Sequence, residues 1–415
     1  MSTSRYNCTI IGAGASGLFT AARILLQRPG TKVALIDSNP RCGKKLMLTG
    51  SGRCNFTNSD LRLSAYNTDD PAKLSRALDR FGSSDAIDFF ENVLGVLTTN
   101  KGDLYYPATF RAGTVVDALR FFVEEHGCQM INGNKVKEIH KDKDLFELVL
   151  DDGSKILSEK TVVATGGFTY PKTGSEGDVK YLMTGLLSYK DFLDFSCSLV
   201  PLYSDDQSLK TIAGIRIPAT VTLDDGKEQT EASGELQITK EGGLSGICIF
   251  DLSGRAVRAV DSGIEPVIYI NFCNAEPGEC CLMAAVRAKM FPERSLSAAF
   301  SGIIQRTVLD YILKKTGYKC NMPAKDLSYD DLVRIADALT SFPIKISSYG
   351  KSSDAQVSQG GVKLSSLDES MQVKKTEGLY VVGEAVNVDG ICGGYNLQWA
   401  WTSAALCADG IIGEL

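Results

Sequence analysis

Hydrophobic positions near the N-terminus predict a strand, a helix and a second strand. Residues 6–11 form a short run typical of a buried strand, and residues 32–36 form another. Between the two runs, Leu18, Ala21 and Leu25 recur on one face of a helix. A strand, a helix and a strand in this order are typical of a βαβ unit in an α/β fold.

A glycine-rich turn joins the first predicted strand to the helix. Its pattern is Gly12-x-Gly14-x-x-Gly17, and Asp37 follows at the end of the second strand. In a dinucleotide-binding unit the first glycine permits a tight turn, the second lets the backbone approach the pyrophosphate, and the third lets the helix pack closely. The helix N-terminus supplies N–H groups for the phosphates, and Asp37 would accept hydrogen bonds from the adenosine ribose.

The C-terminal pattern favours FAD over NAD as the dinucleotide. Residues 378–384 are typical of a turn and a buried strand that ends at an acid, Glu384, and a glycine-rich stretch at 389–397 precedes a helical run. An acid at this position can bind the hydroxyls of a ribityl chain. A glycine-rich helix start can present N–H groups to the N1–C2=O edge of a flavin. A cofactor that needs both ends of the chain is long, as FAD is.

The middle of the chain changes character near residue 199. Before that point, helix signals at 71–82, 84–95 and 114–127 fit the faces of a doubly wound sheet. From 199 to 273 the alternation of apolar and polar residues predicts a β-rich insertion. Residues 282–340 then become helical.

Composition excludes several classes of protein. The 415 residues include 44 Lys and Arg against 50 Asp and Glu, a net charge of −6, which argues against a general nucleic-acid coat or a polybasic membrane binder. Two histidines argue against a histidine-rich metal site or a Ser-His-Asp hydrolase. The twelve cysteines contain no C-x-x-C pair, so we predict no metal site and small buried thiols in a reducing cytoplasm. No apolar stretch reaches the length of a membrane span.

Four segments resemble a known family almost from end to end. They are the N-terminal glycine turn, residues 43–58 with Gly-Arg-Cys-Asn, residues 164–178, and residues 383–401 with Gly-Gly-Tyr-Asn. The chain resembles the HI0933-like flavoproteins, also called the BaiN/RdsA or aminoacetone-oxidase-like family of FAD-dependent, NAD(P)-linked oxidoreductases. The resemblance implies a discontinuous Rossmann-like FAD-binding domain with a barrel-like and a helical insertion. The predicted ranges are 1–190 with 352–415 for the FAD domain, 191–280 with 341–351 for the β-rich domain, and 281–340 for the helical domain.

The resemblance further implies that residues 44–58 wrap over the cofactor. Lys45 and Arg53 would offset pyrophosphate charge, and groups near Cys54 would donate hydrogen bonds to the flavin. Without the resemblance, the same segment could equally be a solvated basic loop. The family usually has a glycine where Ser51 stands, and this departure is tolerable if the turn needs no positive φ there. It usually has a threonine or similar residue where Cys392 stands, so a thiol would lie close to the flavin, as a harmless replacement or a tuning group.

Other segments complete the predicted site. The backbone at Val136 would contact adenine, the strand at 161–167 would run into a glycine turn against the cofactor, and Tyr395 would lie beside the isoalloxazine ring. Arg53 and Tyr395 are the candidates for donors on the substrate side, and no other catalytic residue is predicted. The predicted cofactor-binding residues are Gly12, Gly14, Ala15, Ser16, Gly17, Asp37, Ser38, Lys45, Gly50, Ser51, Gly52, Arg53, Cys54, Asn55, Val136, Ala164, Thr165, Gly166, Gly383, Glu384, Asp389, Gly394, Tyr395, Asn396 and Leu397.

Several functions stay open at this level. The leading hypothesis is flavin-mediated hydride transfer to an activated C=C bond of a small molecule. NAD(P)H would be a transient donor, because no second dinucleotide fingerprint follows a strand. The alternatives are an amine oxidase of the aminoacetone type, an RNA-modifying enzyme that reduces uridine, and an FAD-binding protein with a sensing role. Nucleic acid is the less favoured partner, and the oligomeric state is open.

Overall fold

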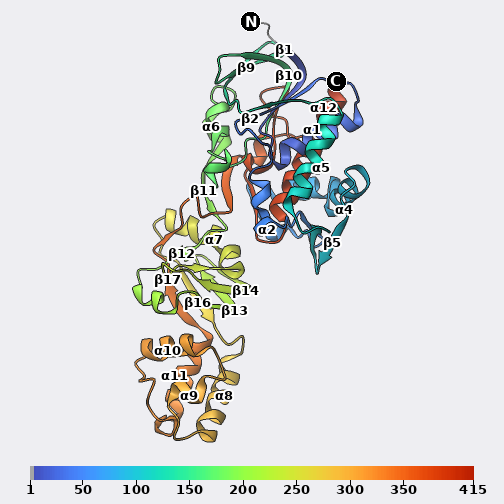
Figure 1. Ribbon diagram of the computed structural model, residues 1–415. Helices are drawn as coiled ribbons and strands as arrows, with labels where there is room; N and C mark the ends of the chain where they lie inside the picture. Colours follow the sequence, from blue (N-terminus) through green and yellow to red (C-terminus); the bar gives the residue numbers. More distant parts are fainter. Residues whose placement is uncertain (1–3) are drawn as a thin grey trace. The chain divides into compact units, whose positions relative to one another are not determined.

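The computed structural model describes residues 4–415 and divides the chain into two units (Figure 1). The first unit contains the chain up to Cys197 together with Ala355–Leu415, and the second contains Ser198–Asp354. The sequence predicted an FAD domain interrupted by insertions. The structure does not divide Ser198–Asp354 further, so separate β-rich and helical domains stay a prediction.

The first unit is built on a mixed sheet that contains the predicted βαβ strands. Its order is β7-β2-β1-β10-β9-β8, and β20 pairs with β10. The pairs β1–β2, β2–β7, β1–β10 and β10–β20 are parallel, whereas β8–β9 and β9–β10 are antiparallel. The bounds are β1 Ser4–Ile11, β2 Val33–Asp37, β7 Gln129–Asn132, β8 Val136–Asp142, β9 Leu145–Leu150, β10 Lys155–Val163 and β20 Leu379–Val381. The predicted α/β, Rossmann-like class is therefore confirmed.

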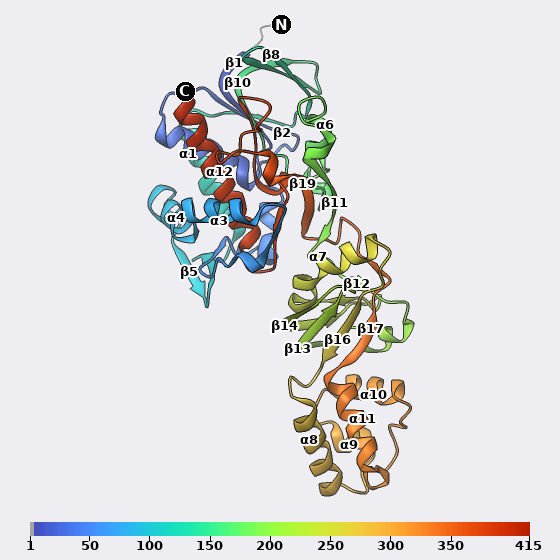
Figure 2. The same cartoon turned by 180° about the vertical axis from the view of Figure 1, so that it is seen from behind.

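Three long helices cover this sheet. They are α1 (Ala15–Gln27), α5 (Ala112–Glu125) and α12 (Tyr395–Glu414). Helix α1 packs against α12 and α5 (Figure 1). Helix α12 also contacts the shorter α3 (Pro71–Arg80), as the view from behind shows (Figure 2). Helix α3 begins as predicted, because the Asp70 carboxylate accepts a hydrogen bond from Lys73 N at 3.0 Å.

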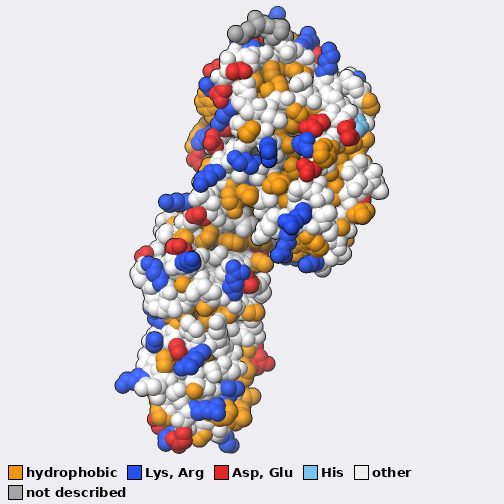
Figure 3. All heavy atoms as spheres, in the orientation of Figure 1, with side chains coloured by type: hydrophobic (Ala, Val, Ile, Leu, Met, Phe, Trp, Pro, Cys, Tyr) orange, Lys and Arg blue, Asp and Glu red, His pale blue; other side chains and the backbone are white. Residues whose placement is uncertain are grey.

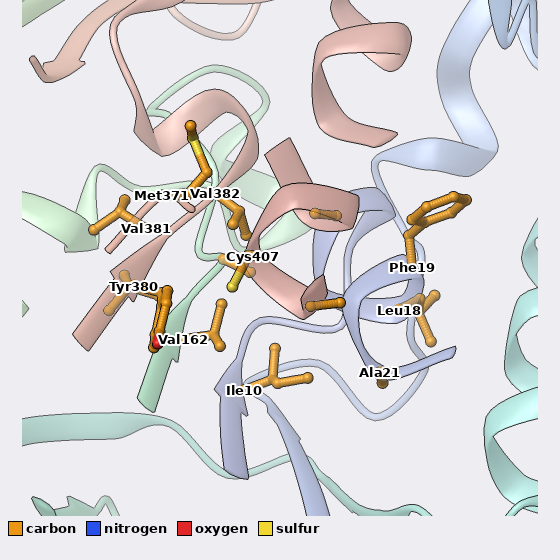
Figure 4. Close-up of a cluster of buried hydrophobic side chains, with 14 of the residues drawn as sticks. Ile10, Leu18, Phe19, Ala21, Val162, Met371, Tyr380, Val381, Val382 and Cys407 are labelled. Atoms are coloured by element: carbon orange, nitrogen blue, oxygen red, sulfur yellow. The ribbon is translucent and has the colours of Figure 1, made fainter. Parts of the chain in front are cut away.

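The core lies between α1, α12 and the parallel strands. Ile10 of β1, Leu18 of α1 and Val162 of β10 are fully buried and point into one cluster (Figure 4). Trp401 packs against Phe19 with ring centroids 5.2 Å apart, and its indole N–H donates to Phe56 O at 2.8 Å. Trp401 is therefore a packing residue that fixes α12 against α1. Trp399 is also buried, and its indole N–H donates to Gly383 O at 3.1 Å.

The second unit contains an antiparallel sheet with the order β17-β16-β13-β14-β15-β12-β18. This sheet confirms the predicted β-rich character. Among the described strands, the pairing runs in one path from β17 to β18. A barrel would need a further pair that closes this path into a ring, and the described pairings do not include one. The bounds are β12 Leu202–Tyr203, β13 Arg216–Asp224, β14 Gln229–Ile238, β15 Leu244–Ser245, β16 Val267–Asn271, β17 Phe342–Lys345 and β18 Ser348–Tyr349. Helices α7 (Ile247–Asp261), α8 (Pro277–Met290), α9 (Leu296–Phe300), α10 (Arg306–Lys315) and α11 (Tyr329–Thr340) complete the unit.

A buried carboxylate ties α7 to the β13–β14 turn. Asp225 accepts hydrogen bonds from the backbone of Lys227 and Glu228, both at 3.0 Å, and from Arg255 Nη2 at 2.7 Å. Burial alone raises the pKa of Asp225, but the hydrogen bonds from Glu228, Arg255 and Lys227 outweigh it and hold this pKa at about 2. The folded-state pKa is below the unfolded value of about 3.9. This carboxylate therefore stabilises the fold above pH ~4, and the contribution is lost as the pH falls towards 2.

We expect Asp225→Asn to lower the free energy of unfolding by about 1–2 kcal/mol at neutral pH and by much less near pH 2. Urea denaturation across this pH range measures the difference. Glu231→Gln, an exposed substitution on β14, serves as the control and should keep the wild-type pH dependence. A constant deficit from neutral pH to pH 2 in Asp225→Asn would contradict the assignment.

In the part of the chain that is described, no helix is both long enough and apolar enough to cross a membrane.

Candidate cofactor site

The glycine turn after β1 is shaped by backbone contacts. Gly12 has φ +104°, and its N–H donates to Ile36 O at 2.7 Å. A Cβ at Gly12 would lie 2.4 Å from Ala164 O, and a Cβ at Gly17 would lie 1.8 Å from Gly12 O. Side chains are thus excluded at both positions, as the tight turn and the close helix packing require.

Gly14 differs from the other two glycines of the turn. It is the residue before α1, with φ −82°, and a Cβ at this position would meet no atom within 4 Å. No acidic residue lies in the first turn of α1, and no described side chain caps its N-terminus. The first-turn N–H groups therefore face an open cradle, which fits the pyrophosphate of a dinucleotide.

A cavity partly open to solvent includes this cradle in its wall. Asp37 and Val136 also line it, and so do Asn396 and Leu397 at the start of α12. This combination of residues suits a dinucleotide whose adenosine would lie at Asp37 and Val136 and whose flavin would lie at the start of α12. The predicted residues that line it are Gly12, Gly14, Ala15, Ser16, Asp37, Ser38, Lys45, Val136, Ala164, Thr165, Gly166, Glu384, Asn396 and Leu397.

At the adenosine end, Asp37 is held by its neighbours. Its carboxylate accepts hydrogen bonds from Ala13 N at 2.7 Å, from Asn39 N at 2.7 Å and from Asn39 Nδ2 at 3.0 Å. These bonds fix the carboxylate at the cavity wall. The proposed contact with the ribose would use its remaining acceptor positions.

Lys45 and Glu384 form an ion pair across the cavity wall. Lys45 Nζ lies 2.7 Å from Glu384 Oε2 and 2.8 Å from Thr169 Oγ1. Glu384 Oε1 also accepts from Ser358 N at 2.7 Å. The sequence predicted that Lys45 offsets pyrophosphate charge and that Glu384 binds the ribityl chain. In the structure Lys45 and Glu384 bind each other, so either side chain would contact FAD while it also takes part in this ion pair.

One buried polar atom of the cavity wall, Thr165 Oγ1, has no protein partner among the described residues. An unpartnered buried hydroxyl is costly, and the polar groups of FAD can satisfy it. Together with the open cradle at Gly14, this hydroxyl shows that the residues present fit FAD. Asn55 Oδ1 is also buried without a partner among the described residues, but Asn55 does not line the cavity.

The remaining predicted residues do not line the cavity. They are Gly17, Gly50, Ser51, Gly52, Arg53, Cys54, Asn55, Gly383, Asp389, Gly394 and Tyr395. Several surround the start of α12. Asp389 accepts from Asn67 Nδ2 at 2.8 Å, and Tyr395 is buried with its ring edge-on to Tyr66 at 5.4 Å. Arg53 is exposed. Their roles as cofactor or substrate contacts stay predictions.

The turn at Thr49–Gly52, labelled α2, is left-handed at its centre. Gly50 has φ +54° and Ser51 has φ +56°, so the condition under which a serine would be harmless is not met. Cys54, with φ +59°, is fully buried, and burial raises its pKa to about 12, which keeps the thiol neutral. The segment holds a strained backbone that glycine would adopt more readily at residue 51.

Ser51→Gly is expected to raise the free energy of unfolding by about 0.5–1 kcal/mol, because it removes the left-handed strain of a residue with a Cβ. Thermal and chemical denaturation of the holoprotein measure this. Ser301→Gly is the matched control, since Ser301 has φ −58° and should lose stability on the same change. Equal destabilisation by both substitutions would show that the turn does not store this strain.

Sequence reasoning missed other residues of the cavity wall. They are Ile11, Ala13, Ile36, Asn39, Gly43, Lys44, Leu46, Thr49, Asn134, Lys135, Thr173, Gly174, Ser175, Asp178, Leu182, Gln356, Val357, Val388, Trp399 and Ala400. The segment 174–178 was part of the motif that carried the resemblance, so its place at the wall could have been predicted. Gln356 and Val357 had no such signal.

The chain matches the family model of the HI0933-like protein Rossmann domain over residues 6–410. It belongs to the HI0933-like family. This confirms the resemblance seen in the sequence and, with the fitted site, the predicted enzyme class, an FAD-dependent oxidoreductase.

Curated relatives in this family cover nearly the whole chain. A 3-dehydro-bile acid delta(4,6)-reductase of Clostridium scindens is 28% identical over 96% of this chain and 97% of its own length. A ribosomal RNA dihydrouridine synthase of Escherichia coli is 29% identical over 98% of both chains.

Solved structures share the fold. A quinol-fumarate reductase has a TM-score of 0.52 at 14% identity and covers 100% of this chain and 72% of that chain. A 3-ketosteroid delta1-dehydrogenase of Sterolibacterium denitrificans has a TM-score of 0.52 at 10% identity and covers 100% of both chains.

Proposed function

We propose that this protein uses FAD to transfer hydride from NAD(P)H to a C=C bond conjugated with a carbonyl group in a small molecule. The observation that carries the proposal is the cavity of the first unit, whose wall combines the open cradle at Gly14 with Asp37, Val136 and the start of α12. Two curated relatives support the reaction type. The name of one describes reduction of double bonds in a 3-dehydro bile acid, and the name of the other describes formation of dihydrouridine. Both reactions saturate a C=C bond near a carbonyl group.

The protein's own residues bind and orient the cofactor. Bound FAD supplies the hydride chemistry. The first turn of α1 would hold the pyrophosphate, and Asn396 would shape the part of the cavity that takes the flavin. Its side chain accepts from Gly390 N at 2.8 Å and donates to Gly390 O at 2.8 Å, which fixes the turn before α12. No acidic residue lies in the first turn of α12, so its N–H groups favour negative charge on a ring placed there.

NAD(P)H is proposed as a donor that docks transiently. The sequence has one glycine fingerprint in its strand–helix context, and that fingerprint is taken by the FAD cradle. We propose two groups on the substrate side. They are the exposed Arg53, which follows the turn at Thr49–Gly52, and the buried Tyr395.

A uridine in RNA is the second candidate acceptor, favoured by the ribosomal RNA dihydrouridine synthases of Escherichia coli and Haemophilus influenzae among the relatives. RNA recognition needs phosphate contacts from basic side chains. On the face in Figure 3, Lys and Arg side chains are interspersed with Asp and Glu. That mixed surface and the net charge of −6 favour the small molecule.

Product analysis separates the candidates. The holoprotein with NADPH is incubated without oxygen with a 3-oxo-4-ene steroid and, separately, with a uridine-containing ribosomal RNA fragment. We expect the steroid to gain the mass of two hydrogens. If the RNA alone gains the mass of two hydrogens, the acceptor would be uridine and not the proposed small molecule. If neither the steroid nor the RNA gains hydrogen, and the flavin oxidises an aminoacetone-type amine instead, the proposed reaction would be overturned.

A further inference from the structure

Two cysteines of the second unit face each other across a short connection. Cys273 follows strand β16, and Cys280 lies in the first half of α8. Their sulfur atoms are 3.8 Å apart. All twelve cysteines are thiols in the structure, and these two lie in sulfur–sulfur contact.

Hydrogen bonds hold the connection between the two cysteines in place. Asn271 Oδ1 accepts from Cys273 N at 3.1 Å, and Asn271 Nδ2 donates to Ala275 O at 3.0 Å. Asn274, at φ +49°, donates to Pro218 O on the neighbouring strand at 3.2 Å. On the other side, Cys280 N donates to Glu276 O at 2.9 Å. Both sulfurs are thus presented from a fixed backbone, and their encounter requires no loop closure.

The two thiols differ in access and in proton affinity. Cys273 is half-buried, whereas the Cys280 side chain is fully buried. Cys273 and Cys280 share a hydrogen bond in which either thiol can donate. This bond lowers the pKa of Cys280, although burial and the nearby Asp337 act in the opposite direction, and together with burial it raises the pKa of Cys273. A half-exposed sulfur that an oxidant can reach therefore lies against a second sulfur that can displace the oxidised group.

We infer that Cys273 and Cys280 form a redox-sensitive dithiol that closes to a disulfide in the presence of a hydroperoxide. Once the pair has lost one proton, the remaining proton moves along the sulfur–sulfur contact to Cys280, and the half-exposed Cys273 thiolate attacks a peroxide oxygen. This gives a sulfenic acid and, with hydrogen peroxide, a hydroxide that takes up the released proton as one water. The Cys280 sulfur then attacks the sulfenic sulfur, the S–S bond forms, and the leaving hydroxide takes the remaining thiol proton as a second water. The two thiols lose two electrons and two protons in total, and the peroxide is reduced.

The disulfide would fasten the start of α8 to the end of β16. Because α8 packs against α11, the bond joins the sheet of the second unit covalently to its helical part. A thiol reductant reverses it. The inference does not depend on the proposed reaction, since it concerns residues outside the cofactor cavity.

Peptide mapping of the full-length holoprotein tests this pairing. The reduced protein is treated with hydrogen peroxide, its free thiols are alkylated, and it is digested with a protease that cleaves after glutamate. Cleavage after Glu279 separates Cys273 from Cys280 unless a disulfide joins them, whereas Pro277 protects the bond after Glu276. We expect a linked pair of peptides that dithiothreitol separates.

The neighbouring Cys281 provides the matched control, because it is adjacent in sequence and also half-buried. Cys281→Ser should form the link at a rate within about twofold of wild type, whereas Cys280→Ser should lower the yield at least about tenfold. A link that persists in Cys280→Ser and disappears in Cys281→Ser would overturn the inference. So would a wild-type protein in which Cys273 stays alkylatable after peroxide treatment.

Discussion

Gly14→Val is expected to give a folded protein that does not retain FAD. A Cβ at residue 14 would meet no protein atom within 4 Å, and φ −82° is ordinary for valine, so we expect the fold to tolerate the change. The valine would instead occupy the cradle in front of the first-turn N–H groups of α1. Loss of close approach to the pyrophosphate should weaken FAD binding at least about a hundredfold, or roughly 3 kcal/mol.

Flavin absorbance per protein after purification measures this loss, and circular dichroism measures the fold. The matched control is Gly278→Val in the first turn of α8, where a Cβ also meets nothing within 4 Å but where no cofactor is placed. That variant should purify with the wild-type flavin content. Wild-type flavin content in Gly14→Val would show that the pyrophosphate does not lie at this turn.

Gly17→Ala is expected to destabilise the first unit, whereas Gly14→Val is expected to leave the fold intact and remove the cofactor. The new Cβ would lie 1.8 Å from Gly12 O, which is backbone and cannot rotate away. Separation of α1 from β1 would be needed, and it would disturb the packing of Leu18 and Phe19, both fully buried. Overpacking of this kind should lower the free energy of unfolding by roughly 3 kcal/mol or more.

Chemical denaturation of the cofactor-free proteins isolates this effect from the stabilisation that a ligand adds. Gly14→Ala, the same substitution three residues earlier, is the control and should unfold within about 1 kcal/mol of wild type. A Gly17→Ala protein as stable as Gly14→Ala would contradict the packing role of the third glycine.

The local part of the site was predictable from the sequence. The spacing of Gly12, Gly14 and Gly17 before Asp37 reflects one continuous βαβ unit, so residues close in sequence determine the turn, the helix and the acid. The strand that ends before Glu384 follows the same logic, because an apolar run of this length is typical of a buried strand.

The pairings between distant segments were not predictable. Lys45 and Glu384 are 339 positions apart, and their ion pair depends on β20 lying next to β10 in the finished sheet. Positive φ at Ser51 is likewise invisible in the residue type, since serine rarely adopts it. The positions of these groups depend on the tertiary structure around them, and the neighbouring residues in the sequence do not indicate them.

The proposed function requires FAD to pass hydride from NAD(P)H to a conjugated C=C bond. The most direct test is anaerobic stopped-flow absorbance of the purified holoprotein at about 450 nm, first mixed with NADPH or NADH and then with a conjugated enone. We expect rapid loss of flavin absorbance with the nucleotide and its recovery with the enone. The proposed function would be contradicted if dithionite reduced the flavin but neither NADPH nor NADH did. It would also be contradicted if the enone left the reduced flavin unchanged.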